Sequence, residues 1–174
     1  MLRKILGLVL AGIAACAVAA ATLEFLPLDR MARKSTAIIR GRVTGATTLK
    51  RGAILYTLWQ VEVLERWKGA TAGQISVAIP GGEASGLRQT FSGAPQPVEG
   101  GEYVFFLWAG QSGLNQVIGL SQGLFGVQRD ADGVFALRAA SSETMLDSAG
   151  HPVRDESVRV ALVDLKEVVR KALE

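Results

Sequence analysis

Hydrophobic and polar residues alternate along much of the chain, and this period of two is typical of half-buried β-strands. The longest alternating run is 54–67, in which Trp59, Val61 and Val63 fall on one face. An earlier run contains Gly41, which marks a bulge or a close crossing of two backbones. The pattern predicts strands at 37–44, 54–67, 74–79, 102–108, 114–120, 124–129 and 134–138, with turns at 45–53 and 130–133.

Helical spacing replaces this alternation near both ends of the chain. Apolar residues at helical spacing after Pro27 predict a short helix over 26–35. An amphipathic pattern predicts a C-terminal helix over 157–174, and the small, polar residues 139–156 form a connector before it. The elements together predict an all-β fold over residues 22–138, either an OB-like barrel or a short β-sandwich, flanked by the two helices.

A glycine- and proline-rich stretch at residues 80–101 separates two of the predicted strands. Glycine and proline disfavour a regular helix, so we expect a loop, interrupted by a short strand where residues alternate. A long loop on a β scaffold is a common binding surface, but turns that only reverse the chain explain the same glycines. The candidate contact residues in this loop are Leu87, Arg88 and Phe91.

The first 21 residues have the composition of an export signal. Arg3 and Lys4 precede nineteen uncharged residues, and small residues near 17–22 offer an Ala-x-Ala cleavage site. The tetrad ending at Cys16 is similar to a bacterial lipobox, which makes Cys16 a candidate lipidation site. A third interpretation is an uncleaved membrane anchor. All three place the protein outside the cytoplasm, in the periplasm or at the cell surface.

Charge and cysteine content narrow the function classes. The formal net charge is +3, and removal of Arg3 and Lys4 with the leader would lower it by two. The remaining basic residues are spread along the chain, which argues against nucleic acid as a partner. Because Cys16 is the one cysteine, the rest of the chain contains no disulfide and depends on its hydrophobic core.

The sequence carries no motif that is specific for an enzyme. The single histidine, His151, lies in the connector with no second histidine or cysteine nearby, which argues against a zinc site or a Ser-His-Asp triad. Glu83 and Glu102 flank the loop and offer the paired carboxylates that glycoside cleavage needs. We expect no metal and no cofactor.

The aromatic residues lie mainly on predicted strands, where filling the core explains most of them. Trp67 and Trp108 lie near strand ends. These two are therefore the aromatic candidates for a binding surface.

Several short segments in residues 25–137 follow one another in a recognisable order. After the helix over 26–35 they are Ala37-Ile38-Ile39-Arg40-Gly41-Arg42-Val43, Val61-Glu62-Val63-Leu64-Glu65-Arg66-Trp67-Lys68-Gly69, Pro80-Gly81-Gly82 and Gly101-Glu102. This order resembles a family of uncharacterised exported bacterial proteins. A strand ending in Gly-Arg-Val before one ending in Trp-Lys-Gly is also similar, more distantly, to the OB-fold barrels of netrin-like modules and tissue inhibitors of metalloproteinases. The resemblance implies a fold and an exported location, but not protease inhibition, because the cysteine framework of those inhibitors is missing.

The sequence therefore predicts an exported, non-catalytic binding module that acts through the loop at 80–101. Its expected partner is an unknown protein or an envelope polymer, and its only membrane contact is through the leader, if that is retained. Two alternatives stay open at this stage, a glycan-cleaving enzyme that uses Glu83 and Glu102, and a structural envelope protein.

Overall fold

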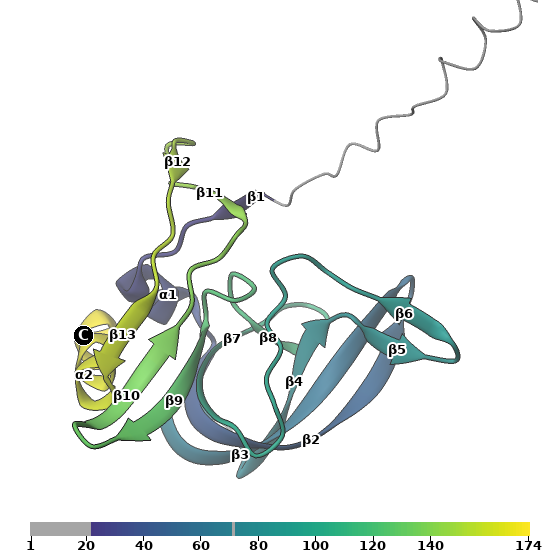
Figure 1. Ribbon diagram of the computed structural model, residues 1–174, viewed down its shortest axis with the longest axis horizontal. Coiled ribbons are helices and arrows are strands. Elements are labelled where there is room, and N and C mark those ends of the chain that lie inside the picture. Colours follow the sequence, from purple (N-terminus) through teal and green to yellow (C-terminus); the bar gives the residue numbers. More distant parts are fainter. Residues whose placement is uncertain (1–21, 71) are drawn as a thin grey trace, which may run out of the picture.

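The computed structural model describes residues 22–70 and 72–174 (Figure 1). The predicted leader, with Cys16, lies outside the described residues, so its cleavage, lipidation or retention stays a prediction. Across the described ranges, neither helix has the length and hydrophobicity needed to cross a membrane.

Five strands are hydrogen-bonded into a closed ring. Strands β7 and β8 pair antiparallel, and β8 closes the ring by pairing parallel with β4. The order of the strands around the ring is β2-β3-β4-β8-β7. They are β2 (Ala37–Arg51), β3 (Ile54–Lys68), β4 (Gln74–Pro80), β7 (Glu102–Ala109) and β8 (Asn115–Val117).

A second group of strands extends the ring on one side. The first half of β7 pairs with β9, and β10 and β13 follow in the same sheet. The two helices pack against each other on this side of the molecule (Figure 1). These elements are β9 (Leu124–Asp130), β10 (Gly133–Arg138), β13 (Val158–Ala161), α1 (Leu28–Lys34) and α2 (Leu162–Leu173). The predicted mostly-β fold, with a short helix near the start and a helix at the C-terminus, is confirmed.

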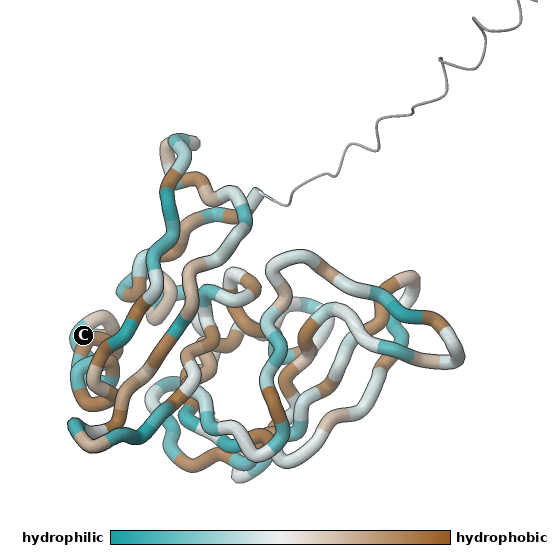
Figure 2. The backbone as a smooth tube through the Cα atoms, in the orientation of Figure 1, coloured by the Kyte–Doolittle hydropathy of each residue, from teal (hydrophilic) through white to brown (hydrophobic). Residues whose placement is uncertain are grey.

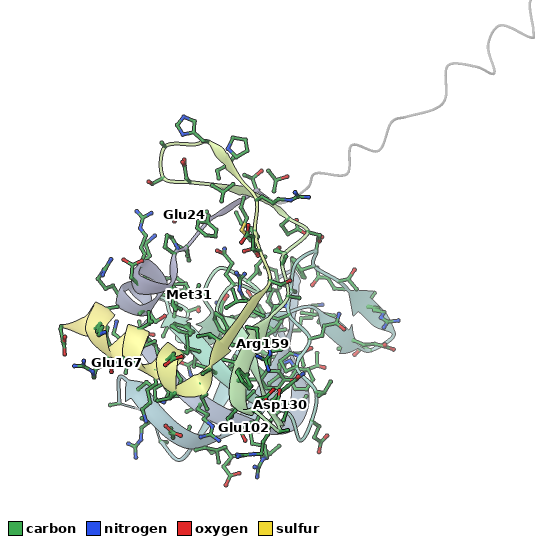
Figure 3. The ribbon with its side chains drawn as sticks, turned by 60° about the vertical axis from the view of Figure 1, so that its left-hand side comes forward. Glu24, Met31, Glu102, Asp130, Arg159 and Glu167 are labelled. Carbon is green, nitrogen blue, oxygen red and sulfur yellow. The ribbon has the colours of Figure 1, made fainter. Side chains whose placement is uncertain are left out.

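A small separate sheet ties the start of the described chain to the later part. Glu24 forms ion pairs with Arg30 and Lys34 of α1, at 3.0 and 2.9 Å, and it lies beside the helix that carries the buried Met31 (Figure 3). The buried side chain of Gln122 also accepts a hydrogen bond from the Leu26 N–H at 2.9 Å. The sheet consists of β1 (Thr22–Glu24), β11 (Thr144–Leu146) and β12 (Pro152–Val153).

Residues 37–39 of β2 and 104–107 of β7 are buried on both faces, so two hydrophobic cores share one wall. Ile39 and Phe105 point into the ring, whereas Ile38 and Phe106 point towards the helices. All four side chains are fully buried. Hydrophobic and hydrophilic positions alternate along most of the strands, and the projecting segment at residues 82–89 also contains both kinds (Figure 2). Burial on both faces explains why β7 is a continuous apolar run.

Four sequence predictions are wrong in detail. The strand predicted at 114–120 is limited to β8, because residues 118–123 form turns. Residues 45–51 continue β2 instead of forming a turn, because they pair with the first half of β3. The predicted connector at 139–156 contains β11 and β12. The first residues of the predicted helix over 157–174 form strand β13, because Val158 and Val160 alternate and pair with β10, so the helix begins at Leu162.

Gly41 lies at a close approach of two strands, as the sequence predicts. The pairing of β2 with β3 is irregular there, and a Cβ atom at Gly41 would lie 2.5 Å from Val61 Cγ1. We expect Gly41→Ala to lower the free energy of unfolding by about 1–3 kcal/mol, because the added methyl group overpacks the strand. The control is Gly45→Ala on the same strand, where a Cβ would have no atom within 4 Å. Urea unfolding measures both variants, and equal losses would contradict this role of Gly41.

Candidate functional site

A short hairpin projects from the ring at the end opposite the helices (Figure 1). It is formed by β5 (Gly82–Ala84) and β6 (Leu87–Gln89), which pair antiparallel. Ser85 and Gly86 both have positive φ angles, 50° and 75°. This is the backbone that a two-residue type I′ turn requires, so the hairpin has a defined geometry.

Hydrogen bonds hold the hairpin against the long β2–β3 arm. The Leu55 N–H donates to the side-chain carbonyl of Gln89 at 2.7 Å, and the Gly81 N–H donates to the Leu55 carbonyl at 2.8 Å. Hydroxyl groups add two bonds, because Thr57 donates to the Gly81 carbonyl and Thr48 to that of Glu83. The hairpin therefore has a fixed position over β3.

The rest of the predicted loop is fastened at its far end. The Ser92 hydroxyl donates to the buried carboxylate of Glu143, which comes from the chain just before β11. The Gly100 N–H donates to the Val43 carbonyl at 2.8 Å. Tyr103 accepts a hydrogen bond from the Val98 N–H at 3.0 Å. An ordered loop of this kind loses less conformational entropy when it binds a ligand than a flexible loop does.

A cavity of about 290 Å³ lies between the hairpin, strands β3 and β4, and the proline-rich part of the loop. Its apolar lining includes Trp59, Ile79 and Phe91. Its remaining lining residues are Thr57, Pro80, Gly81, Gly82, Glu83, Arg88, Gln89, Thr90, Ala94, Pro95, Gln96 and Pro97. We call this space the hairpin cavity.

Several polar groups of the hairpin cavity have no partner in the part of the chain that the structure describes. Among the described residues, no hydrogen bond or ion pair engages the indole N–H of Trp59 or the side chains of Glu83, Arg88, Thr90 and Gln96. Glu83 and Arg88 are opposite each other in the hairpin register but form no ion pair there. These groups are free to bind a ligand or water.

The structure brings only some of the predicted site residues together. Arg88 and Phe91 line the hairpin cavity, whereas Leu87, on β6 with 60% of its surface exposed, is not among the lining residues. Trp108 is exposed at the end of β7 and lines a different hollow with Leu26. The five candidates therefore belong to more than one surface.

Trp67 lies at the end of β3 against helix α2. Its indole N–H donates to Glu65 at 3.1 Å, and the Lys166 ammonium lies 6.0 Å from the centre of its ring. Glu65 also accepts from Lys166 at 2.7 Å and from Arg40 at 2.5 Å. Trp67 is therefore a packing residue at the junction of sheet and helix, with part of its surface exposed to the grooves beside α2.

Glu65 makes the stability of this junction depend on pH. Hydrogen bonding from Lys166 lowers the pKa of Glu65 to about 2, although partial burial opposes the shift. An unfolded glutamate titrates near about 4.3, so the contribution of Glu65 is complete above that pH and is lost as pH falls through about 2. We expect Glu65→Gln to make the acid-induced loss of stability shallower in urea unfolding measured from about pH 5 down to about pH 2. Glu62→Gln is the control, since Glu62 has no ion-pair partner in the described ranges, and an unchanged profile in Glu65→Gln would contradict the assignment.

The two carboxylates considered for glycoside cleavage have different surroundings. Glu102 accepts a hydrogen bond from Arg40 at 2.6 Å and lies 3.8 Å from Arg42. Its carboxylate is therefore paired with the two arginines of β2. It does not line the hairpin cavity, which Glu83 does. His151 is exposed in the β11–β12 turn, with Nδ1 at 3.3 Å from Asp147. Within residues 22–70 and 72–174, no three His, Cys, Asp or Glu side chains are grouped as metal ligands would be.

Sequence reasoning missed part of the cavity lining. Trp59 lies on a strand whose alternation indicates a core residue, and it does pack against the ring core. Thr90 and Gln96 carry no signal beyond their place in the loop. Glu83 and Arg88 are paired in the hairpin register. The one sequence signal for this pairing is the short turn between the two residues.

Comparison of the chain with known protein families, curated proteins and solved structures gave no match. The resemblance to exported bacterial proteins therefore stays a prediction.

Proposed function

We propose that this chain is an exported, non-catalytic binding module that holds its ligand in the hairpin cavity. The observation that carries the proposal is a fastened cavity in which five polar groups have no partner among the described residues. Polar groups at an ordered, partly apolar hollow are typical of a site that binds a small group of another molecule. The leader sequence supports export to the periplasm or cell surface.

In this proposal the ring of strands is a small OB-like barrel. The closed order of five strands and the parallel pairing of β4 with β8 support it. The barrel provides the rigid wall of β3 and β4, and the hairpin provides the opposite wall. The partner is a protein or an envelope polymer, and nucleic acid is not expected because the basic residues form no common patch in the sequence.

A catalytic function is less well supported. Glycoside cleavage needs two carboxylates on either side of one bond. Glu102 is paired with Arg40, and only Glu83 lines the cavity. We therefore do not propose the glycan-cleaving alternative.

In-cell cross-linking followed by purification tests the proposed function. The native chain is compared with a variant in which Leu87, Arg88 and Phe91 are changed to alanine. The control variant carries alanine at three exposed positions away from the cavity, Arg129, Val163 and Val168. We expect a discrete partner with the native and control chains and its loss in the hairpin variant.

Circular dichroism must show that all three chains fold. Equal recovery from the native chain and the hairpin variant would overturn the proposed site. Absence of any partner from all three would favour the structural envelope protein that the sequence left open.

A further inference from the structure

The hairpin cavity is lined by one positively charged and one negatively charged side chain, and neither forms an ion pair in the described parts of the chain. Arg88 supplies a guanidinium group and Glu83 a carboxylate. Thr90 and Gln96 add a hydroxyl and an amide, each of which can donate and accept. The lining is therefore rich in hydrogen-bonding groups but has no net charge among these residues.

This balance selects between classes of ligand. A purely apolar group would remove water from Arg88 and Glu83 without replacing the lost hydrogen bonds, which is unfavourable. An anionic group would be attracted by Arg88 but repelled by Glu83. A cationic group would be attracted by Glu83 but repelled by Arg88. Uncharged hydroxyl groups satisfy both, because each hydroxyl donates to a carboxylate and accepts from a guanidinium.

The apolar lining adds a requirement for flat surfaces. Trp59 and Phe91 are the aromatic residues of the cavity lining, and the indole N–H of Trp59 has no partner in the described ranges. An aromatic ring with a polar edge suits a ligand that is apolar on one face and polar around its rim. The volume, about 290 Å³, is just below the range of roughly 300–1,000 Å³ for small-molecule pockets, so it accommodates one ring-sized unit.

From these observations we propose that the hairpin cavity binds one pyranose residue of an uncharged glycan. This inference rests on the proposed binding function and specifies its ligand. The C–H face of the sugar packs against Trp59 and Phe91, and its hydroxyl groups bond to Glu83 and Arg88. The rest of the glycan chain continues outside the cavity.

Nuclear magnetic resonance of the ¹⁵N-labelled full chain tests the proposal. The chain has three tryptophans, so their indole N–H signals are assignable by Trp→Phe variants. The sample is kept in a polyoxyethylene detergent, which carries no sugar. The probes are trisaccharides of glucose, of N-acetylglucosamine and of galacturonic acid, together with an extended peptide of uncharged residues, each added up to about 10 mM.

We expect at least one of the two uncharged trisaccharides to move the Trp59 signal while the Trp67 and Trp108 signals stay in place. Arg88→Gln and Glu83→Gln should each weaken that binding about threefold to tenfold. Arg129→Gln is the matched control, because Arg129 is exposed on β9 and does not line the cavity, and it should leave binding unchanged. Both cavity substitutions are at exposed positions of the hairpin, so the variants are expected to fold.

The glycan assignment is overturned if neither uncharged trisaccharide moves the Trp59 signal. This includes the cases in which only the acidic trisaccharide moves it, only the peptide moves it, or no probe moves it. In each of these cases the proposed binding function still stands if cross-linking recovers a partner through the hairpin. If cross-linking also shows no dependence on the hairpin, the proposed function fails as well.

Discussion

Replacing Asp155 with asparagine is expected to lower the free energy of unfolding by about 3–5 kcal/mol. Asp155 has 1% of its side chain exposed and accepts two hydrogen bonds from Arg138, each 2.8 Å long. It also accepts from the Ser141 N–H at 2.8 Å. The substitution leaves the buried guanidinium of Arg138 without its counter-charge, and an uncompensated buried charge is far more costly than a lost surface ion pair.

The matched control for this prediction is Asp130→Asn. Asp130 pairs with Arg159 at 2.8 Å, and both side chains are about half exposed (Figure 3). We expect this change to cost less than about 1 kcal/mol. Urea unfolding near neutral pH measures both variants. Similar losses would show that the Arg138–Asp155 pair does not stabilise the fold more than an exposed ion pair does.

The Arg138–Asp155 pair also makes the stability of the fold depend on pH. Burial raises the pKa of Asp155, but the hydrogen bonds from Arg138 and Ser141 outweigh it and hold the pKa below its ordinary value. A lowered pKa stabilises the folded state above the unfolded value, near about 3.9, and this contribution is lost as pH falls through the folded pKa. In Asp155→Asn that part of the acid-induced loss should be absent.

Truncation of Phe106 should have an effect of similar size, but at a different place in the molecule. Phe106 is fully buried in the core under the helices and packs on Phe125, with ring centres 5.7 Å apart. Phe106→Ala is expected to cost about 3–5 kcal/mol, because a large buried side chain leaves a cavity. Hydrogen exchange should show the loss of protection first in helix α2, which shares this core through Leu165 and Val169.

The neighbouring residue supplies the comparison. Phe105 is equally buried but belongs to the core inside the ring, with Val77 and Ile79 of β4. Phe105→Ala should cost a similar amount but reduce protection first in β4. The milder Phe106→Leu and Phe105→Leu variants replace the alanine variants if those do not fold. The account of two cores that share one wall would be contradicted if both substitutions weakened the same element first.

Local patterns predicted the elements whose residues alternate clearly. The strand around Val61, the hairpin formed by β9 and β10, and the short helix that contains Met31 follow from apolar spacing and turn residues. Residues 45–51 were not predicted as strand, because their glycine and threonines resemble a turn until the pairing with β3 is known. Val158 fits helical spacing as well as strand alternation, and only its place beside β10 decides between them.

The candidate site was predicted in part for the same reason. The loop composition indicated Arg88 and Phe91, and both line the cavity. Trp59 could not be assigned to it, since an aromatic residue on a strand has the pattern of a core residue. The bond between Ser92 and Glu143 joins positions 51 residues apart, so no local pattern could show that the loop is fastened.

The central claim is that a ligand is bound in the hairpin cavity, and site-specific photo-cross-linking in cells tests it most directly. A photoreactive amino acid is placed at Gln96, which is exposed and lines the cavity, and in a parallel strain at Arg129, which is exposed but distant in the sheet on β9. We predict an adduct of defined mass from position 96 and none from position 129. An adduct from position 129 alone, equal adducts from both positions, or none from either would contradict the claim.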